Sequence, residues 1–256
     1  MKKVLALILM LALPLTGICE DDADFMEAEK TENTPSDNYA DDFPFTDDDF
    51  EDLLISDPLE PLNRGFFWFN DKLYFYFLKP VAKAFRYVPE PWRISIKHFF
   101  NNLAAPVSIV NAGLQGKFGD AGNELTRFLT NTTLGIGGFF DPSREHFGIN
   151  RKNEDTGQTL GHYGIGTGPY LVLPFLGPSD LRDAIGGFGD TYLDISYYLW
   201  RKDKDNYDYI ASKAVNAINA VSLDKDTYEG IKQDALDPYL YMRDAYSQYR
   251  KNLVKE

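Results

Sequence analysis

The sequence predicts a mostly α-helical body with one irregular glycine-rich segment, preceded by a disordered acidic tail. Three observations lead to this fold class. Apolar residues recur at spacings of three and four, which marks one buried face of a helix. Convincing strand alternation is absent. The stretch from Gly135 to Gly189 holds 13 of the 20 glycines, and glycine in the interior of a helix or strand is destabilising.

The first 19 residues have the pattern of an export signal. Lys2 and Lys3 precede an apolar stretch and a small-residue exit. That stretch is shorter than the roughly 20 residues that cross a bilayer. Cys19 is the only cysteine, so an internal disulfide is excluded. It stands where a bacterial lipoprotein carries its acylated cysteine, although Thr16 and Ile18 depart from the usual attachment box. A lipid anchor and ordinary signal cleavage both remain open.

Residues 20–52 form a strongly acidic segment. They contain 15 acidic residues and a single base, Lys30. With its prolines and without a helical period, the segment is predicted to be a disordered tether. It is a solvated tether or a spacer that acidic headgroups repel. The body that follows is nearly neutral, so there is no basic field to bind nucleic acid.

The body, residues 53–256, is read as a single helical domain. The Asp57-Pro58 step opens a helix to about Leu78, and Pro80 restarts it. Ser179 is a plausible N-cap for a helix that begins at Asp180. Asp237-Pro238 is a good start for the last helix, because proline suits the first helical position. The remaining predicted helices are 92–103, 106–114, 120–129, 207–221 and 224–236.

Aromatic side chains fill eight of the twelve positions from Phe66 to Phe77. A helix that is apolar all round is buried or lies in lipid, and aromatic rings with polar tips favour the headgroup level of a bilayer. The alternative is a core helix of a soluble domain. The export signal favours membrane contact.

Catalysis finds little support in the sequence. His98, His146 and His162 are widely spaced and have no cysteine companions, so a zinc site is not expected. A GxSxG nucleophile elbow is absent. Asp180 and Asp183 flank Arg182, which suggests an ion pair more than an acid–base pair. We therefore expect a protein that is not an enzyme and that uses no cofactor or metal.

Three segments carry a specific resemblance to a known family. The longest is the run from Gly157 to Asp183, GQTLGHYGIGTGPYLVLPFLGPSDLRD. An upstream block reads DPLEPLNR from Asp57 and continues to Phe69-Asn70, and a downstream block begins at Asp237-Pro-Tyr. Together they resemble the VacJ/MlaA family of outer-membrane phospholipid-trafficking lipoproteins. The resemblance spans nearly the whole body.

The resemblance implies a ring-like helical body at the periplasmic face of the outer membrane. Members of the family provide an amphipathic channel that removes mislocalised phospholipids from the outer leaflet and maintains lipid asymmetry. The implied partners are phospholipid, a soluble periplasmic lipid-carrier protein and a trimeric outer-membrane porin. Two rivals remain: a structural outer-membrane anchor or interaction protein without transport, and a phospholipid-modifying enzyme, which the missing nucleophile motif disfavours.

The candidates for the lipid path and its gating come from these segments. They are Phe66, Phe69, Asn70, Gly161, Gly164, Gly166, Gly168 and Arg182. Phe69 and Asn70 stand at the break in the aromatic helix and are expected to hold a resting state. The Gly161–Gly168 loop is either a mobile element beside the path or a tight structural turn. Arg182 is either a headgroup contact or a structural ion pair.

Overall fold

The computed structural model of the chain describes residues 55, 57–201, 207–224 and 226–255. The predicted signal peptide, the acidic tether and the anchor candidate Cys19 lie outside the described residues. The body is mostly helical with one small sheet, which confirms the predicted fold class. The elements are α4 (Glu60–Leu73), the π-helix η2 (Tyr74–Leu78), α5 (Lys79–Phe85), α6 (Glu90–Leu114), α7 (Phe118–Thr133), α8 (Pro142–Phe147), α9 (Thr156–His162), β1 (Tyr170–Leu173), β2 (Gly177–Asp180), α10 (Leu181–Leu193), α11 (Ile195–Trp200), α12 (Tyr207–Leu223), α13 (Thr227–Asp234) and α14 (Pro238–Lys255).

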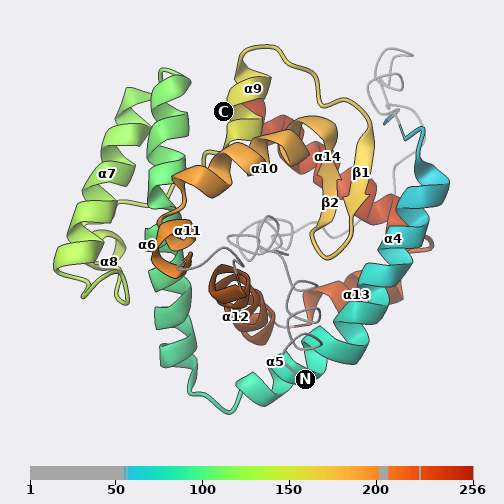
Figure 1. The fold of residues 1–256 in the computed structure, drawn as a ribbon, viewed down its shortest axis with the longest axis horizontal. Coiled ribbons are helices and arrows are strands. Elements are labelled where there is room, and N and C mark those ends of the chain that lie inside the picture. Colours follow the sequence, from blue (N-terminus) through green and yellow to red (C-terminus); the bar gives the residue numbers. More distant parts are fainter. Residues whose placement is uncertain (1–54, 56, 202–206, 225, 256) are drawn as a thin grey trace, which may run out of the picture.

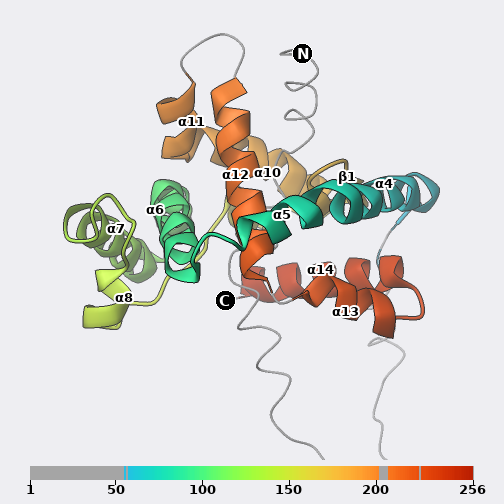
Figure 2. The same cartoon turned by 90° about the horizontal axis from the view of Figure 1, so that it is seen from below.

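The elements are arranged in a ring (Figure 1). Helices α4, α5 and α6 follow one another around it, and α10 and the β1–β2 hairpin complete the side opposite α5. Helix α12 lies within the ring and packs against α5 and α6. In the perpendicular view, α13 and α14 lie on one side of the layer formed by α4 and α5, and α12 crosses that layer (Figure 2).

Several helix boundaries differ from the sequence prediction, and two of the differences have a clear physical reason. Helix α6 runs unbroken through Pro106, where two separate helices were expected. Proline removes one backbone hydrogen bond, and a 25-residue helix that packs against α7, α9 and α12 retains enough other contacts to continue. The N-cap of α10 is Asp180 and not Ser179, because the Asp180 carboxylate accepts the Asp183 amide at 2.7 Å.

The glycine-rich segment contains an antiparallel hairpin that the sequence did not predict. Strands β1 and β2 pair with Tyr170 opposite Asp180 and Leu173 opposite Gly177. The turn places Pro174 second and Phe175 third, with a positive φ of 69° at Phe175. The Leu176 amide donates to the Leu173 carbonyl at 3.2 Å. This arrangement fits a type II turn, whose third residue needs a positive φ.

The interior is more polar than that of an ordinary soluble domain. Among the described residues, 25 polar or charged residues are buried, against 14 buried apolar ones. Helix α7 shows the inversion most clearly, because all its buried residues are polar: Glu124, Arg127 and Asn131. Its exposed residues include Leu125 and Leu129. Soluble helices bury the apolar face instead.

Exposed apolar side chains are concentrated on α4 to α11. Of the 31 large hydrophobic residues exposed in the described part of the chain, 27 lie between Leu59 and Leu199 and only four between Tyr207 and Tyr241. Soluble monomers rarely expose apolar surface on this scale, and such surface marks contact with a membrane or a protein. Within the described residues, none of the helices has both the length and the apolar character needed to cross a bilayer.

Candidate functional site

The β1–β2 hairpin is held against α4 by two asparagine side chains. Asn63 donates to the Tyr170 carbonyl at 3.0 Å and accepts the Val172 amide at 2.9 Å. Asn70 donates to the Leu173 carbonyl at 2.9 Å and accepts the Phe175 amide at 2.8 Å. Because the two residues are seven positions apart, they lie on the same face of the helix.

Each asparagine side chain substitutes for a neighbouring strand. A primary amide carries one acceptor and one donor group. Here it pairs with the carbonyl of residue i and the N–H of residue i+2, as one residue of a parallel neighbouring strand does. The edge of β1 that faces away from β2 is thereby satisfied at Tyr170 and Val172. Asn63 is fully buried and also donates to Asp57 at 2.8 Å.

The turn of the hairpin is strained and supported by α4. Phe175 is a bulky residue at positive φ, a conformation that costs on the order of 1–3 kcal/mol. Its amide is held by Asn70, and its ring packs edge-on against Phe69 with centroids 5.0 Å apart. Phe69 and Asn70 together therefore hold the turn in a backbone conformation that Phe175 disfavours.

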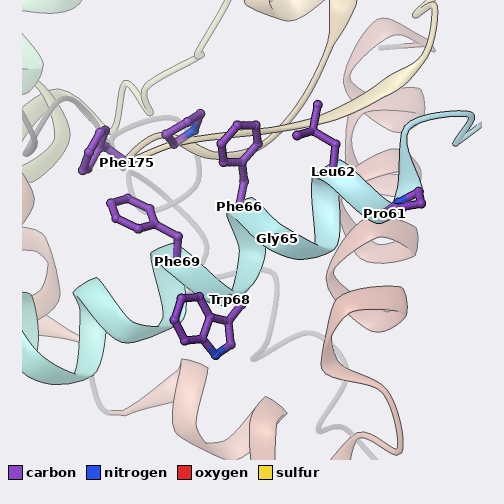
Figure 3. Close-up of a pocket in the computed structure, with 8 residues that line it drawn as sticks. Pro61, Leu62, Gly65, Phe66, Trp68, Phe69 and Phe175 are labelled. Carbon is purple, nitrogen blue, oxygen red and sulfur yellow. The ribbon is translucent and has the colours of Figure 1, made fainter.

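An apolar pocket of about 370 Å³ lies between α4 and the turn. Figure 3 shows the Phe69 and Phe175 rings next to each other and Phe66 on the same side of α4, while Trp68 points to the opposite side. The lining residues are Pro61, Leu62, Gly65, Phe66, Trp68, Phe69, Pro174 and Phe175. Because none of them is charged, the pocket is suited to hydrocarbon.

The other end of the hairpin is held by a buried ion-pair cluster. Arg182 lies 3.1 Å from Asp183 and 3.7 Å from Asp180. Arg250, on α14, binds both carboxylate oxygens of Asp155, at 2.6 and 2.9 Å, and one oxygen of Asp183 at 2.5 Å. The cluster links α9, α10 and the end of β2 to α14. Arg182 thus has the ion-pair contacts that the sequence suggested.

The carboxylates of this cluster differ in pKa. Burial and the neighbouring charge of Asp183 raise the pKa of Asp180 to about 6. Asp155 is partly desolvated as well, but the Arg250 guanidinium and the Gln158 amide more than offset this desolvation and hold its pKa below the usual value. Asp180 is therefore the carboxylate of this pair that changes charge near neutral pH.

The reason why glycine is required differs among the candidate positions. Gly164 and Gly168 adopt positive φ values of 81° and 70°, which most side chains avoid. A Cβ at Gly161 would lie 2.7 Å from the Arg182 guanidinium. Gly166 has neither a positive φ nor a neighbour within 4 Å of a built Cβ. Sequence reasoning missed Gly186, where a Cβ would meet the Gly157 backbone nitrogen at 2.5 Å.

The structure divides the aromatic block between two environments. Trp68, Tyr76 and Phe77 are exposed. Phe67 packs edge-on against Tyr239, and Phe66 packs against the buried Tyr170, Val172 and Tyr239. The block is therefore part core and part exposed apolar surface. The core interpretation holds for Phe66 and Phe67, and membrane contact of the exposed residues stays a prediction.

The first and last of the three segments singled out in the sequence meet in space. Arg64 of the first binds Asp237 of the last at 2.9 Å and lies over the Tyr239 ring at 4.4 Å. The Tyr239 hydroxyl also donates to Asp57. The middle segment supplies the hairpin, whose Tyr170 packs against Tyr239. All three segments thus build one region around the hairpin.

The scattered arginines mostly serve structure. Arg93 donates to the Val88 and Ser222 carbonyls, and Arg127 binds Asp141 at 2.8 Å. Three important residues were missed in the sequence: Asn63, Phe175 and Arg250. Asn63 lay within a recognised motif, but no sequence signal pointed to the strand edge that it satisfies.

Fold and site together define a ring-shaped helical protein with an exposed apolar surface and an apolar pocket beside an anchored hairpin. Comparison with known proteins agrees. The family model of the MlaA lipoprotein matches residues 55–253. The Escherichia coli (strain K12) protein described as intermembrane phospholipid transport system lipoprotein MlaA is 39% identical over 201 residues, which cover 75% of this chain and 76% of that protein. The chain belongs to the MlaA lipoprotein family.

Two further relatives support this assignment. The Haemophilus influenzae protein with the same description is 32% identical over 196 residues, 75% of this chain and 77% of that protein. A solved structure described as "Structural basis for maintenance of bacterial outer membrane lipid asymmetry" matches with a TM-score of 0.69 and 38% identity. The match covers 78% of this chain and 99% of the solved one.

Proposed function

We propose that this chain is the outer-membrane component of an intermembrane phospholipid transport system. It removes mislocalised phospholipids from the outer leaflet through an amphipathic path and passes them to a periplasmic carrier, which maintains lipid asymmetry. The names of its relatives support this role. The observation that carries the proposal is the inverted burial of a ring-shaped body, with polar residues inside and apolar ones exposed.

The physical need for such a path follows from the hydrophobic effect. Each CH₂ group moved from hydrocarbon to water costs about 0.8 kcal/mol, so a two-tailed lipid leaves a bilayer slowly on its own. A path with apolar surface for the chains and polar groups for the head lowers that barrier. No covalent chemistry is required, and we propose a role in transport without catalysis.

The ring lies in the periplasmic leaflet of the outer membrane in this proposal. The exposed apolar side chains of α7, Leu125 and Leu129, contact lipid or a trimeric porin there. The polar α14, which carries few exposed apolar residues, faces the periplasm and the carrier. Leu129→Lys puts a charge on the apolar face without touching the buried polar residues, and should weaken membrane association. Asn252→Lys, on the exposed face of α14, which this proposal turns toward the periplasm, is the comparison. Equal association of both variants would refute this placement.

The turn of the hairpin is the proposed gate. Phe69 and Asn70 hold Phe175 in its strained conformation beside the apolar pocket. Deleting Phe69 and Asn70 removes both contacts and shifts the rest of α4 by two positions in the helical register. Lipid flow should therefore become abnormal. Unchanged outer-leaflet composition in cells that carry the deletion would refute the gate.

The Gly161–Gly168 loop and Arg182 support the base of the same hairpin in this proposal. Arg182→Ala should impair transport by loosening that base. Normal lipid distribution with this variant would remove Arg182 from the path.

A lipid anchor at Cys19 completes the proposal. Intact-mass analysis of the protein extracted from membranes tests it, because a mass without acyl groups excludes the anchor.

The rival proposal, a structural anchor without transport, makes a different prediction in cells. Cells that lack a transporter should accumulate phospholipid in the outer leaflet, whereas cells that lack an anchor should keep a normal distribution. A membrane-impermeant reagent that labels amine headgroups measures this directly. Expression of the Leu129→Lys variant in the same cells separates loss of transport from loss of membrane placement.

A further inference from the structure

A second pocket, of about 300 Å³, lies where α14 ends beside the glycine-rich loop. Its lining is mostly basic, whereas the pocket at the turn is lined by apolar residues. The described residues that line it are Thr167, Arg182, Arg250, Lys251, Val254 and Lys255. Four of these six carry a positive charge, and among these described residues none is acidic. The pocket is therefore suited to an anion.

Arg182 provides an unused donor in this pocket. The residue is 6% exposed, and its Nη2 atom is buried without a hydrogen-bond partner among the described residues. The Asp180 carboxylate oxygen is 3.7 Å from this atom, beyond hydrogen-bonding distance. A buried donor without a partner is unfavourable, and each such group in a native structure calls for an explanation. A ligand oxygen in the pocket would supply the missing acceptor.

The acidic residues of the neighbouring cluster do not line the pocket, and they bind other groups. Asp155 accepts the Gln158 amide and Asp180 accepts the Asp183 amide, each at 2.7 Å, at the starts of α9 and α10. They and Asp183 balance Arg182 and Arg250 in part. Within the described part of the chain, the lining itself contains four basic residues and no acidic one, so the pocket is more positive than the cluster beside it.

We propose that this pocket binds a phosphate group, as a phosphodiester headgroup or as free inorganic phosphate. Arginine presents paired donors that match phosphate oxygens, lysine contributes a point charge, and the Thr167 hydroxyl can donate a further hydrogen bond. A volume of about 300 Å³ is at the lower end of the range for ligand pockets. It suits a headgroup and not a whole two-tailed lipid. The site stands on this geometry and does not require the chain to transport lipid.

Calorimetric titration of the purified full chain in a nonionic detergent tests the site. The two probes are inorganic phosphate and glycerophosphoethanolamine, a soluble diester without acyl chains. Binding should weaken as salt is raised, because the contacts are between charges. Tighter binding of the diester assigns the site to a lipid headgroup, and tighter binding of inorganic phosphate assigns it to the free ion.

Surface variants keep the test independent of folding. The double variant Lys251→Gln/Lys255→Gln should weaken binding of the preferred probe at least fivefold, and Thr167→Val by a smaller factor. Lys83→Gln, on the exposed surface of α5, is the matched control and should bind as the unaltered chain does. Absence of binding for both probes, or affinity unaffected by the double variant, would overturn the proposal. Neither result bears on lipid distribution in cells, which tests the proposed function separately.

Discussion

Replacing Asn70 by alanine tests how the hairpin is held on α4. The substitution removes the hydrogen bonds of Asn70 to the Leu173 carbonyl and the Phe175 amide, at 2.9 and 2.8 Å. Each such bond contributes about 1 kcal/mol net, with a range of about 0.5–1.5. Losing both should favour release of the turn by about 1–3 kcal/mol, which corresponds to a factor of about 5–150 in the equilibrium between docked and released turn.

Residue-resolved amide hydrogen exchange by NMR measures this release. The Phe175 amide should exchange faster in Asn70→Ala by about the same 5–150-fold factor. The Val172 amide, which Asn63 holds, should change much less and provides an internal reference. Asn70→Asp keeps an acceptor for the Phe175 amide and should give an intermediate rate. Asn252→Ala, on the exposed face of α14, controls for a general effect of losing an asparagine side chain.

Unchanged exchange at Phe175 in Asn70→Ala would refute the reasoning, since the Asn70 amide would then not hold the turn. An equal acceleration at Val172 and Phe175 would also contradict it. That result would mean that the hairpin is released as a unit and that Asn63 provides no separate attachment.

Three further predictions concern stability, measured as the free energy of unfolding in detergent. Gly186→Ala should unfold at markedly lower denaturant because its Cβ meets backbone at 2.5 Å, whereas Gly166→Ala should be nearly neutral; equal effects would contradict the packing described. Arg250→Ala should cost about 1–3 kcal/mol, because Asp155 loses its guanidinium partner while Asp183 keeps Arg182, and a loss below about 0.5 kcal/mol would count against the cluster. The pKa of Asp180 is raised to about 6, so the folded state holds a proton that the unfolded state has released and stability falls as pH rises toward 6. Asp180→Asn should remove about 1 kcal/mol of the fall between pH 5 and pH 7, and an unchanged pH profile would exclude this role.

Much of the helical framework could be predicted from the sequence because its signals are local. The last helix begins at Asp237-Pro238, where the Asp237 carboxylate accepts the Tyr239 amide as an N-cap does. The helix over 207–221 was predicted from apolar spacing alone and extends to Leu223 in the structure. These signals depend only on neighbours within a few positions along the chain.

The hairpin could not be predicted in this way. Strand β1 has four residues, and within the described part of the chain β2 is its only backbone partner. Its other edge is satisfied by Asn63 and the following turn is held by Asn70, both more than 100 residues earlier in the sequence. Two-stranded hairpins are marginal without packing on another element, so this element exists because α4 is present. The interpretation of the segment as irregular was wrong for residues 170–180.

The candidate site likewise contains residues that the sequence could identify and residues that it could not. Phe69 and Asn70 were singled out from their place in the aromatic helix, and the structure adds their contacts with Phe175. Arg250 was not singled out because its partners, Asp155 and Asp183, come from distant segments. Contacts of this kind arise from tertiary packing, which no local pattern encodes.

The most direct test of the central proposal is the amount of phospholipid in the outer leaflet of cells that lack this chain. Labelling with a membrane-impermeant amine reagent, compared with cells that express the chain again, gives that amount. We predict a rise in labelled phospholipid without the chain and a return to the normal level when it is restored. Equal labelling in both kinds of cell would contradict the proposed transport.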